Sequence, residues 1–363
     1  MPNRSQIESR ARQLRMRFEA AGGQVVDPPL LQPAGTLLDL YGEDIRARAY
    51  VTSDALRGEQ MLRPDFTVPV VQMHMEEGAE PARYTYSGEV FRRQEHDPDR
   101  SNEYVQVGYE VFDRADPAEA DAEVFSLFAL QLRGTPVRAA TGDIGILMAA
   151  VAGLNTTEAR KRALMRHVWR PRRFRALLDR YSGRIPMPEA RANLLSSSGD
   201  LSATAPQIGL RSGAEVQARI EALRADAAAP PLAEHELVAL ANLLAVRETM
   251  PFALERLRDV AVDLPQINAA LDRLEARIAA LTARGVDVSN LDFEASYGRT
   301  SMEYYDGFVF GFYAESRPDL PPVAGGGRYD ALTRHLGQGV EIPAVGGVLR
   351  PDLILTLEQE IRS

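Results

Sequence analysis

The sequence predicts an α+β fold in which a mainly antiparallel sheet is flanked by helices and interrupted by a mostly helical insertion. Two observations lead to this prediction. Strand-like segments occur at residues 84–112 and again after residue 285, whereas residues 155–284 are rich in Ala, Leu, Arg and Glu and poor in aromatic residues. Strands and helices that are segregated along a chain are typical of the α+β class.

The N-terminal residues predict a helix followed by an irregular strand. Apolar residues recur at helical spacing between residues 7 and 18, and Gly22-Gly23 ends the pattern. Residues 24–26 have extended character and run into Pro28-Pro29. Two successive prolines exclude a helix, so we expect an edge strand or an irregular strand there.

A second helix start is marked after strands predicted at 84–91 and 103–112. Asp116 is the expected N-cap, Pro117 occupies the first helical position, and Glu119 completes a predicted capping box. The other predicted elements are a strand at 137–141, a short helix at 144–151, strands at 286–293, 304–313 and 344–349, a Gly-rich turn at 325–327, and a closing helix with Pro351 near its start.

The composition narrows the class of protein. The net charge of the 363 residues is −9, which argues against a large polyanion-binding surface. Cysteine is absent and the five histidines are scattered, so we expect no disulfide, no metal site and no cofactor. No stretch approaches the roughly 20 apolar residues of a membrane span. The N-terminus has no apolar signal core, and a cytoplasmic location is therefore expected.

Polar groups lie on one face of the strand predicted at 103–112. Period-two alternation places Gln106, Gly108 and Glu110 together on that face. An amide and a carboxylate flanking a glycine suggest the floor of a ligand site. The strand predicted at 304–313 likewise carries glycines opposite three phenylalanines, and glycine inside a strand often marks the close approach of a ligand or of backbone. The alternative is a solvent-exposed sheet face, and the pattern alone leaves both open.

Two other segments invite a functional interpretation. Residues 325–328 read GGGR, but they do not form a phosphate loop, because the motif requires a Gly-Lys pair and the only lysine is Lys161. We interpret them as a tight turn beside a site. The segment from Arg160 to Arg180 is rich in arginine, and it is either a nucleic-acid patch, a solvated helical face or a protein-docking surface. The acidic total favours the last two.

Several motifs, in the same order along the chain, resemble those of the histidyl-tRNA synthetases, a class II aminoacyl-tRNA synthetase family. They are the Arg-Pro-acid-x-Thr loop at 62–67 (LRPDFT), the second class II motif at 84–92 (YTYSGEVFR), the two histidine-specific motifs at 303–305 (EYY) and 324–330 (AGGGRYD), and the start of the third class II motif at 343–346 (PAVG). The resemblance implies a class II synthetase-like core formed by residues 1–154 and 285–363, with residues 155–284 as the helical insertion.

The resemblance also implies a histidine-binding site, because seven residues match family positions. Their expected roles are ammonium binding for Asp65, Thr67 and Gln106, enclosure of the imidazole for Glu110, Tyr305 and Tyr329, and carboxylate binding for Arg92. Glu110 is the expected discriminating residue, because a carboxylate that faces a ring N–H makes a charge-assisted hydrogen bond. The alternative is that Asp65 and Glu110 only join the sheet to a loop.

The departures from the family concern its nucleotide-binding groups. Positions that carry arginine in the synthetases are occupied here by Thr300, Leu353 and Asn102, and an acidic position is occupied by Gln94. Arg299 is one residue away from the first of these positions and is expected to face the other way. Losing one oriented charge donor typically lowers the rate on the order of 10²–10³-fold. We therefore expect that the chain is not an enzyme.

The expected core keeps the amino-acid pocket but lacks the ATP-binding cations, and we expect no anticodon-binding domain. This combination resembles the regulatory subunits of ATP phosphoribosyltransferase, the first enzyme of histidine biosynthesis. The resemblance implies a hetero-oligomer with a short catalytic subunit, which needs this chain for activity and for feedback inhibition by histidine. It also implies a dimer across the region of Pro28-Pro29. Two alternatives stay open, a histidine-activating ligase that uses Arg92 and the pocket, and a tRNA-sensing module, which the acidic charge disfavours.

Overall fold

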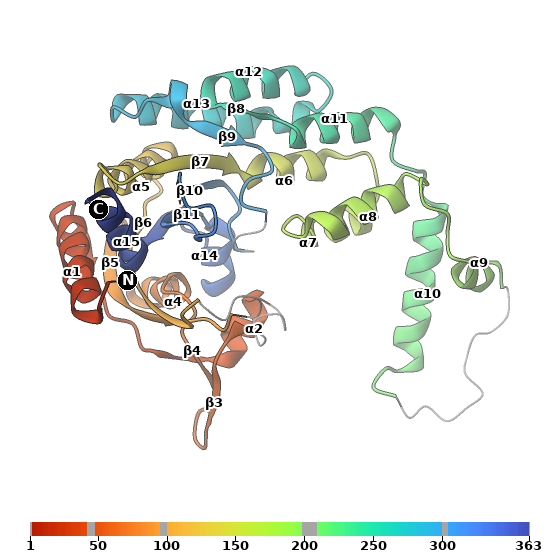
Figure 1. Cartoon of the computed structure of the whole chain (residues 1–363). Coiled ribbons are helices and arrows are strands. Elements are labelled where there is room, and N and C mark those ends of the chain that lie inside the picture. The colour runs from red at the N-terminus through yellow and green to blue at the C-terminus, as the bar shows by residue number, and fades with distance from the viewer. Residues whose placement is uncertain (1, 42–47, 95–99, 198–208, 300–303, 363) are drawn as a thin grey trace.

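The computed structural model describes residues 2–41, 48–94, 100–197, 209–299 and 304–362, and within them a nine-stranded sheet forms the centre of the molecule (Figure 1). The strand order is β1-β5-β6-β12-β11-β10-β7-β9-β8. The strands are β1 (Gln24–Val25), β5 (Ala82–Phe91), β6 (Glu103–Phe112), β7 (Val137–Asp143), β8 (Arg247–Thr249), β9 (Asp292–Glu294), β10 (Phe308–Ala314), β11 (Ala324–Arg328) and β12 (Ala344–Leu349). All neighbours pair antiparallel except β1 with β5 and β7 with β9, so the predicted mainly antiparallel sheet is confirmed.

A smaller sheet and the helices complete the fold. The small sheet has the order β2-β4-β3. Its strands are β2 (Leu31–Pro33), β3 (Val51–Asp54) and β4 (Gly58–Leu62). The helices are α1 (Arg4–Ala20), α2 (Ala34–Tyr41), α4 (Thr67–Glu77), α5 (Pro117–Gln131), α6 (Ile144–Gly153), α7 (Glu158–Arg166), α8 (Pro171–Tyr181), α9 (Glu189–Ser196), α10 (Gly213–Ala228), α11 (Glu234–Leu244), α12 (Met250–Val260), α13 (Asn268–Ala283), α14 (Asp330–Leu336) and α15 (Pro351–Arg362), with 3₁₀ turns η1 (Pro265–Ile267) and η2 (Val288–Asn290).

The two faces of the central sheet meet different helices. On one face, Phe18 of α1 stacks on Tyr109 of β6 at a ring distance of 5.2 Å. The three phenylalanines of β10 pack against Phe125 of α5 on the same side, which confirms the predicted aromatic core face. On the other face, Thr67 at the start of α4 reaches Glu110 of β6. Helices therefore flank the sheet as the sequence predicted, and the polar face of β6 points toward α4.

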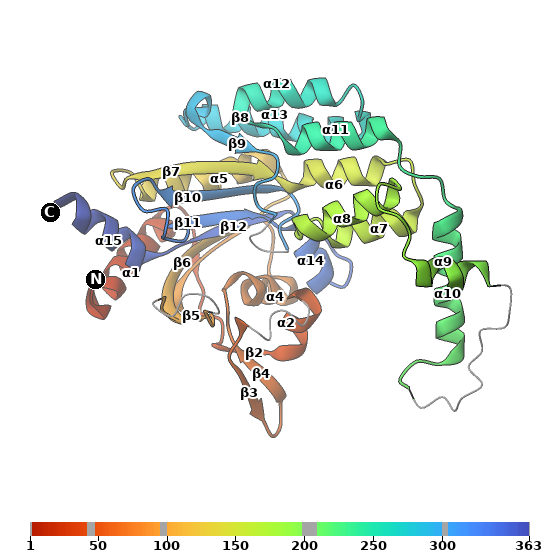
Figure 2. The same ribbon diagram turned by 45° about the vertical axis from the view of Figure 1, so that its right-hand side comes forward.

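The described part of residues 155–284 is mostly helical, and its helices lie partly along the sheet and partly away from it. Helices α11, α12 and α13 lie along one edge of the sheet, where β8 from the same segment pairs with β9, whereas α9 and α10 extend away from the sheet (Figures 1 and 2). The buried guanidinium of Arg277 in α13 bridges Asp121 of α5 and Asp143 at the end of β7, with N–O distances of 2.8 and 2.9 Å. This ion network joins α13 to the sheet.

Several elements differ from their predicted form. The glycines at 325–327 belong to strand β11, which pairs with β10 and β12, and do not form a turn. A Cβ on Gly326 would lie 2.2 Å from the carbonyl oxygen of Gly346. Glycine there lets two strands approach closely. The strand predicted at 286–293 is reduced to β9, preceded by η2. Asp116 caps α5, but Glu119 does not close a capping box, since its carboxylate binds Arg284 at 2.8 Å.

Among the described residues, no helix combines the length and apolar character that crossing a bilayer requires.

Candidate functional site

Glu110 lies in the middle of β6 with none of its surface exposed to solvent. Its Oε1 accepts hydrogen bonds from the hydroxyls of Tyr86 at 2.7 Å and Thr67 at 3.0 Å, and its Oε2 accepts one from the hydroxyl of Tyr329 at 2.6 Å. Burial of a carboxylate is unfavourable unless such partners compensate for the lost water. The polar face of β6 is therefore interior, and the solvent-exposed alternative for this face is wrong.

Burial and hydrogen bonding have opposite effects on the pKa of Glu110. Burial raises its pKa from 4.5 to about 7, although the three hydroxyl hydrogen bonds oppose the rise, and the nearby carboxylate of Asp65 adds to it. The ionised form of Glu110 is thus less favoured than that of an exposed glutamate. A ligand that offers an N–H or a positive charge would favour its ionised form, because both stabilise a buried carboxylate.

Two glycines on neighbouring strands make room for this arrangement. A Cβ on Gly346 of β12 would lie 1.5 Å from Oε2 of Glu110, and a Cβ on Gly108 would lie 2.1 Å from the ring of Tyr86. Gly108 pairs with Tyr86 across β5 and β6, so the aromatic ring covers the glycine. The close approach expected from glycine within a strand is thus found, with protein side chains as the approaching groups.

Aromatic stacking holds the loop at 62–67 against the sheet. The ring of Phe66 stacks on Tyr86 with centroids 4.3 Å apart, and the guanidinium carbon of Arg63 lies 3.8 Å above the ring of Phe66. Arg63 is buried and donates to the carbonyl oxygens of Glu89 and Pro28. This anchoring places the loop beside β6.

Asp65 and Arg92 form the charged part of the site. Asp65 is 3% exposed, and its Oδ2 lies 4.0 Å from Nη2 of Arg92. Arg92 also donates from Nε to the carbonyl oxygen of Pro64 at 2.7 Å. The guanidinium is held at the loop while its opposite end faces a carboxylate.

Gln106 and Tyr305 complete the set of predicted residues. Gln106 is 3% exposed on the same face of β6 as Glu110, and its Oε1 has no hydrogen-bond partner among the described residues. Tyr305 precedes β10 and is buried, and the charges of Glu110, Asp65 and Arg92 all act on its hydroxyl group. A buried amide oxygen without a hydrogen-bond partner is uncommon, and a ligand with an N–H or O–H group would provide that partner.

The structure brings five separate segments of the chain together around Glu110, and all seven predicted residues belong to them. Thr67 and Tyr329 bind Glu110 directly, Asp65 faces Arg92, and Gln106 and Tyr305 lie within the same buried region. Tyr86 was not among the predicted residues. The feature that identifies Tyr86 is its pairing across β5 and β6 with Gly108, the glycine on the polar face of β6.

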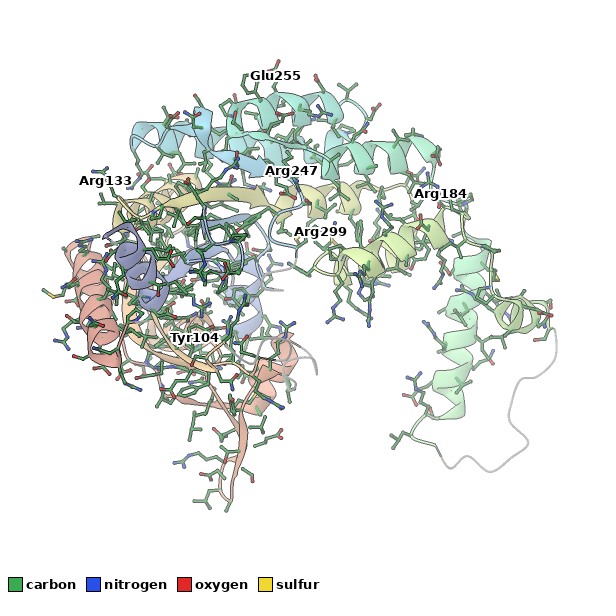
Figure 3. All side chains as sticks on the ribbon, in the orientation of Figure 1. Tyr104, Arg133, Arg184, Arg247, Glu255 and Arg299 are labelled. Atoms are coloured by element: carbon green, nitrogen blue, oxygen red, sulfur yellow. The ribbon has the colours of Figure 1, made fainter. Side chains whose placement is uncertain are left out.

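The positions that depart from the synthetase pattern have other roles where they are described. Arg299 is 5% exposed, donates from Nε to the carbonyl oxygen of Val168 at 2.8 Å, and lies 4.9 Å from the ring of Phe174 (Figure 3). It is therefore committed to the segment of α7 and α8, consistent with its expected orientation away from the pocket. Leu353 is buried in α15, 8% exposed. Thr300 and Glu303 lie outside the described residues.

The other two departures, Gln94 and Asn102, are bonded to each other. The backbone N–H of Gln94 donates to Oδ1 of Asn102 at 2.9 Å, and the backbone N–H of Arg92 donates to the Asn102 carbonyl oxygen at 2.8 Å. Asn102 thus ties the ends of β5 and β6 together. Arg350, three residues before Leu353, lies with its guanidinium 4.1 Å above the ring of Tyr104. In the described ranges, no group of three or more acidic or histidine side chains is arranged to hold a metal ion.

Comparisons with known proteins agree with this architecture. A family model described as histidyl-tRNA synthetase matches residues 2–228 and 210–354. Proteins of Brucella ovis and Brucella abortus named ATP phosphoribosyltransferase regulatory subunit are each 31% identical to this chain over 367 residues, covering 96% of this chain and 96% of each relative.

Solved structures show the same fold at lower identity. An ATP phosphoribosyltransferase regulatory subunit/histidyl-tRNA synthetase from Bacillus halodurans superposes with a TM-score of 0.67 at 20% identity, covering 97% of this chain and 79% of that chain. A histidine–tRNA ligase subunit from Alicyclobacillus acidocaldarius superposes with a TM-score of 0.61 at 21% identity, covering 99% and 94%. The chain therefore belongs to the family of ATP phosphoribosyltransferase regulatory subunits and has the class II, histidyl-tRNA synthetase-like fold.

Proposed function

We propose that this chain binds free histidine around Glu110 and acts as a non-catalytic regulatory subunit of ATP phosphoribosyltransferase in the first step of histidine biosynthesis. In this proposal it forms a hetero-oligomer with a short catalytic subunit, supports the activity of that subunit, and mediates feedback inhibition by histidine. The observation that carries the proposal is the buried carboxylate of Glu110, which three hydroxyls hold, on the same strand face as the buried amide oxygen of Gln106, which has no partner among the described residues.

The chemistry of the site suits histidine better than an apolar amino acid. A carboxylate can accept about four hydrogen bonds, and Glu110 accepts three from protein hydroxyls. The remaining acceptor direction suits an imidazole N–H. The free amide oxygen of Gln106 and the carboxylate of Asp65 are acceptors for an ammonium group, and Arg92 is a donor for a carboxylate.

The same region offers little support for adenylation. An adenylating site needs fixed cations where charge develops on the α-phosphate. Leu353 presents an apolar side chain at a position that carries arginine in the synthetases, and Arg299 is tied to Val168. We expect no histidine-dependent exchange of pyrophosphate into ATP, and exchange at a useful rate would favour the ligase alternative.

Titration calorimetry tests the ligand. Glu110→Ala should weaken histidine binding by roughly 1.5–3 kcal/mol, the range for hydrogen bonds to charged groups. Glu255→Ala, in which an exposed glutamate of α12 is truncated, is the matched control and should bind as the wild type does. Unchanged affinity in Glu110→Ala, or no histidine binding by the wild-type chain alone and in the complex, would reject the assignment.

Reconstitution tests the regulatory role. The activity of the purified catalytic subunit is measured alone, with this chain, and with this chain and histidine. We expect activation by the chain, inhibition by histidine in the complex, and weaker inhibition with Glu110→Ala. Light scattering on each mixture measures the stoichiometry and the proposed self-association around Pro28-Pro29. A catalytic subunit that is indifferent to the chain contradicts the proposal.

A further inference from the structure

Helices α7 and α8 concentrate positive charge in an acidic protein. Residues 158–181 contain nine cations and two acidic residues, whereas the whole chain has a net charge of −9. Six of these arginines are exposed, and all of them except Arg180, which binds Asp226, have no ion pair within the described part of the chain. The other five form what we call the arginine surface, and its members are Arg162, Arg166, Arg172, Arg173 and Arg175.

The aromatic residues of this segment point inward. Phe174 and Tyr181 are 1% and 6% exposed, and the indole N–H of Trp169 donates to the backbone oxygen of Tyr305. Proteins that bind single-stranded nucleic acid stack bases on exposed aromatic rings, and α7 and α8 expose none. The arginine surface therefore fits a protein partner better than a nucleic acid, since arginine is enriched at protein interfaces while lysine is depleted there.

A cavity of about 400 Å³ lies at the C-terminal end of α8, the helix that carries three members of the arginine surface. On one side, Arg160, Arg180 and Arg191 converge on the carboxylate of Asp226 at 2.7–2.9 Å. Although burial raises the pKa of Asp226, hydrogen bonds from these three arginines lower it to about 2. The three arginines and Asp226 together carry an excess of two positive charges.

The other side of the cavity is apolar. Its lining includes Ile185 and Met187, which are 49% and 45% exposed. Cations surrounding an apolar cavity match a partner surface on which acidic side chains flank an apolar one, because complementary charges steer and align the two proteins.

The segment with the arginine surface is bonded directly to the candidate site. Trp169 Nε1 lies 3.1 Å from the backbone oxygen of Tyr305, and Arg299 Nε lies 2.8 Å from the backbone oxygen of Val168. Arg299 also packs over Phe174 of α8. A shift of the backbone at Tyr305 would thus be transmitted to the connection between α7 and α8 through the Trp169 hydrogen bond. Both helices lie between the sheet and α10 (Figures 1 and 2).

We propose that the arginine surface docks an acidic surface of the catalytic subunit, and that the Trp169–Tyr305 hydrogen bond couples this docking to the occupancy of the site around Glu110. The inference rests on the proposed function for the identity of the partner. Allosteric coupling of this kind requires that ligand and partner bias the same structural element, and the loop at Tyr305 contacts both the site and the docking helices.

A charge-reversal experiment tests the surface. The triple variant Arg172→Glu, Arg173→Glu, Arg175→Glu changes exposed side chains without ion-pair partners among the described residues. Its matched control reverses three other exposed arginines, Arg12, Arg133 and Arg256, and so changes the net charge by the same amount. Affinity for the catalytic subunit is measured by biolayer interferometry at several salt concentrations, and histidine binding to each free chain is measured by calorimetry.

We expect the α8 triple variant to bind the catalytic subunit at least about tenfold more weakly, with a reduced salt dependence, and to retain histidine binding. The control should change the affinity by less than about twofold, as expected for remote, screened charges. If both variants lose the same affinity for the catalytic subunit, or if the α8 variant keeps wild-type affinity, the arginine surface is not the docking surface. If the wild-type chain binds a single-stranded RNA and the α8 variant does not, the partner of the arginine surface is a nucleic acid and not a protein. A wild-type chain that neither binds nor activates the catalytic subunit rejects the proposed function and this surface with it.

A second variant tests the coupling. Trp169→Phe removes the indole N–H that donates to Tyr305 and keeps an aromatic ring. The complex should assemble with wild-type affinity, while the histidine concentration for half-inhibition rises at least about fivefold, the lower end of the usual range of coupling energies. An unchanged histidine response in a fully assembled complex overturns the coupling.

Discussion

Replacing the buried carboxylate of Glu110 by an amide should change how the stability of the protein depends on pH. In the folded protein, burial raises the pKa of Glu110 from 4.5 to about 7. Between these values the folded state holds a proton that the unfolded chain has released, so the free energy of unfolding falls as pH rises through this window. Integrated over the window, ionisation of Glu110 lowers the stability by about 3 kcal/mol above pH 7.

Glu110→Gln keeps the shape of the side chain and removes its titration. The amide retains an acceptor for Tyr86 or Thr67, although its NH₂ requires Tyr329 to accept where it previously donated. The stability of the variant relative to the wild type should therefore rise by about 2.5 kcal/mol between pH 5 and pH 8, whatever its offset at pH 5. Titrating groups that are not coupled to Glu110 cancel in this difference.

Urea denaturation monitored by circular dichroism at pH 5, 6, 7 and 8 measures this difference. Glu255→Gln, at an exposed glutamate on α12, should run parallel to the wild type over the same range. A difference between Glu110→Gln and the wild type that stays constant from pH 5 to pH 8 would falsify the argument, because it would mean that Glu110 titrates as it does in the unfolded chain. The same variant should bind histidine more weakly.

Three further changes test other parts of the structure. Arg277→Met leaves the buried carboxylate of Asp143 without its guanidinium and leaves Asp121 with that of Arg328 alone, and it should lower the free energy of unfolding by about 3–5 kcal/mol in urea denaturation; a loss below about 1 kcal/mol would contradict the bridging role. Gly346→Ala places a Cβ 1.5 Å from Oε2 of Glu110 and should remove detectable histidine binding in calorimetry, whereas Gly325→Ala, whose nearest atom is 3.4 Å away, should retain it. Burial and a neighbouring carboxylate raise the pKa of Asp306 to about 7, so Asp306→Asn should gain stability relative to the wild type between pH 4 and pH 8, and a parallel pH profile would refute this.

Local patterns predicted many elements because their signals lie within a few residues of one another. Strands β6 and β12 span the predicted residues, since alternation and bounding turns mark their ends. The start of α5 was predicted from Asp116 and Pro117, and its side-chain cap forms as expected. The capping box failed for a non-local reason, because Arg284, distant in sequence, competes for the carboxylate of Glu119.

The linear order of motifs also predicted much of the site, including Thr67, Glu110 and Tyr329. It did not reveal Tyr86, which reaches Glu110 only because β5 and β6 pair in a register that sets Tyr86 opposite Gly108. Pairing register is a property of two strands and the turn between them, and no single segment encodes it.

By itself, the sequence determined the class of fold, the family to which the chain belongs and the residues that carry the polar face of β6. The tertiary structure alone decided that this face is interior, that three hydroxyls from different segments meet at Glu110, and that burial moves the pKa of Glu110 toward neutrality. It also decided that the run of glycines before Arg328 is a strand. The physical reason is common to these cases. Alternation and capping act between neighbours in sequence, whereas desolvation and close strand approach depend on atoms that folding brings from elsewhere in the chain.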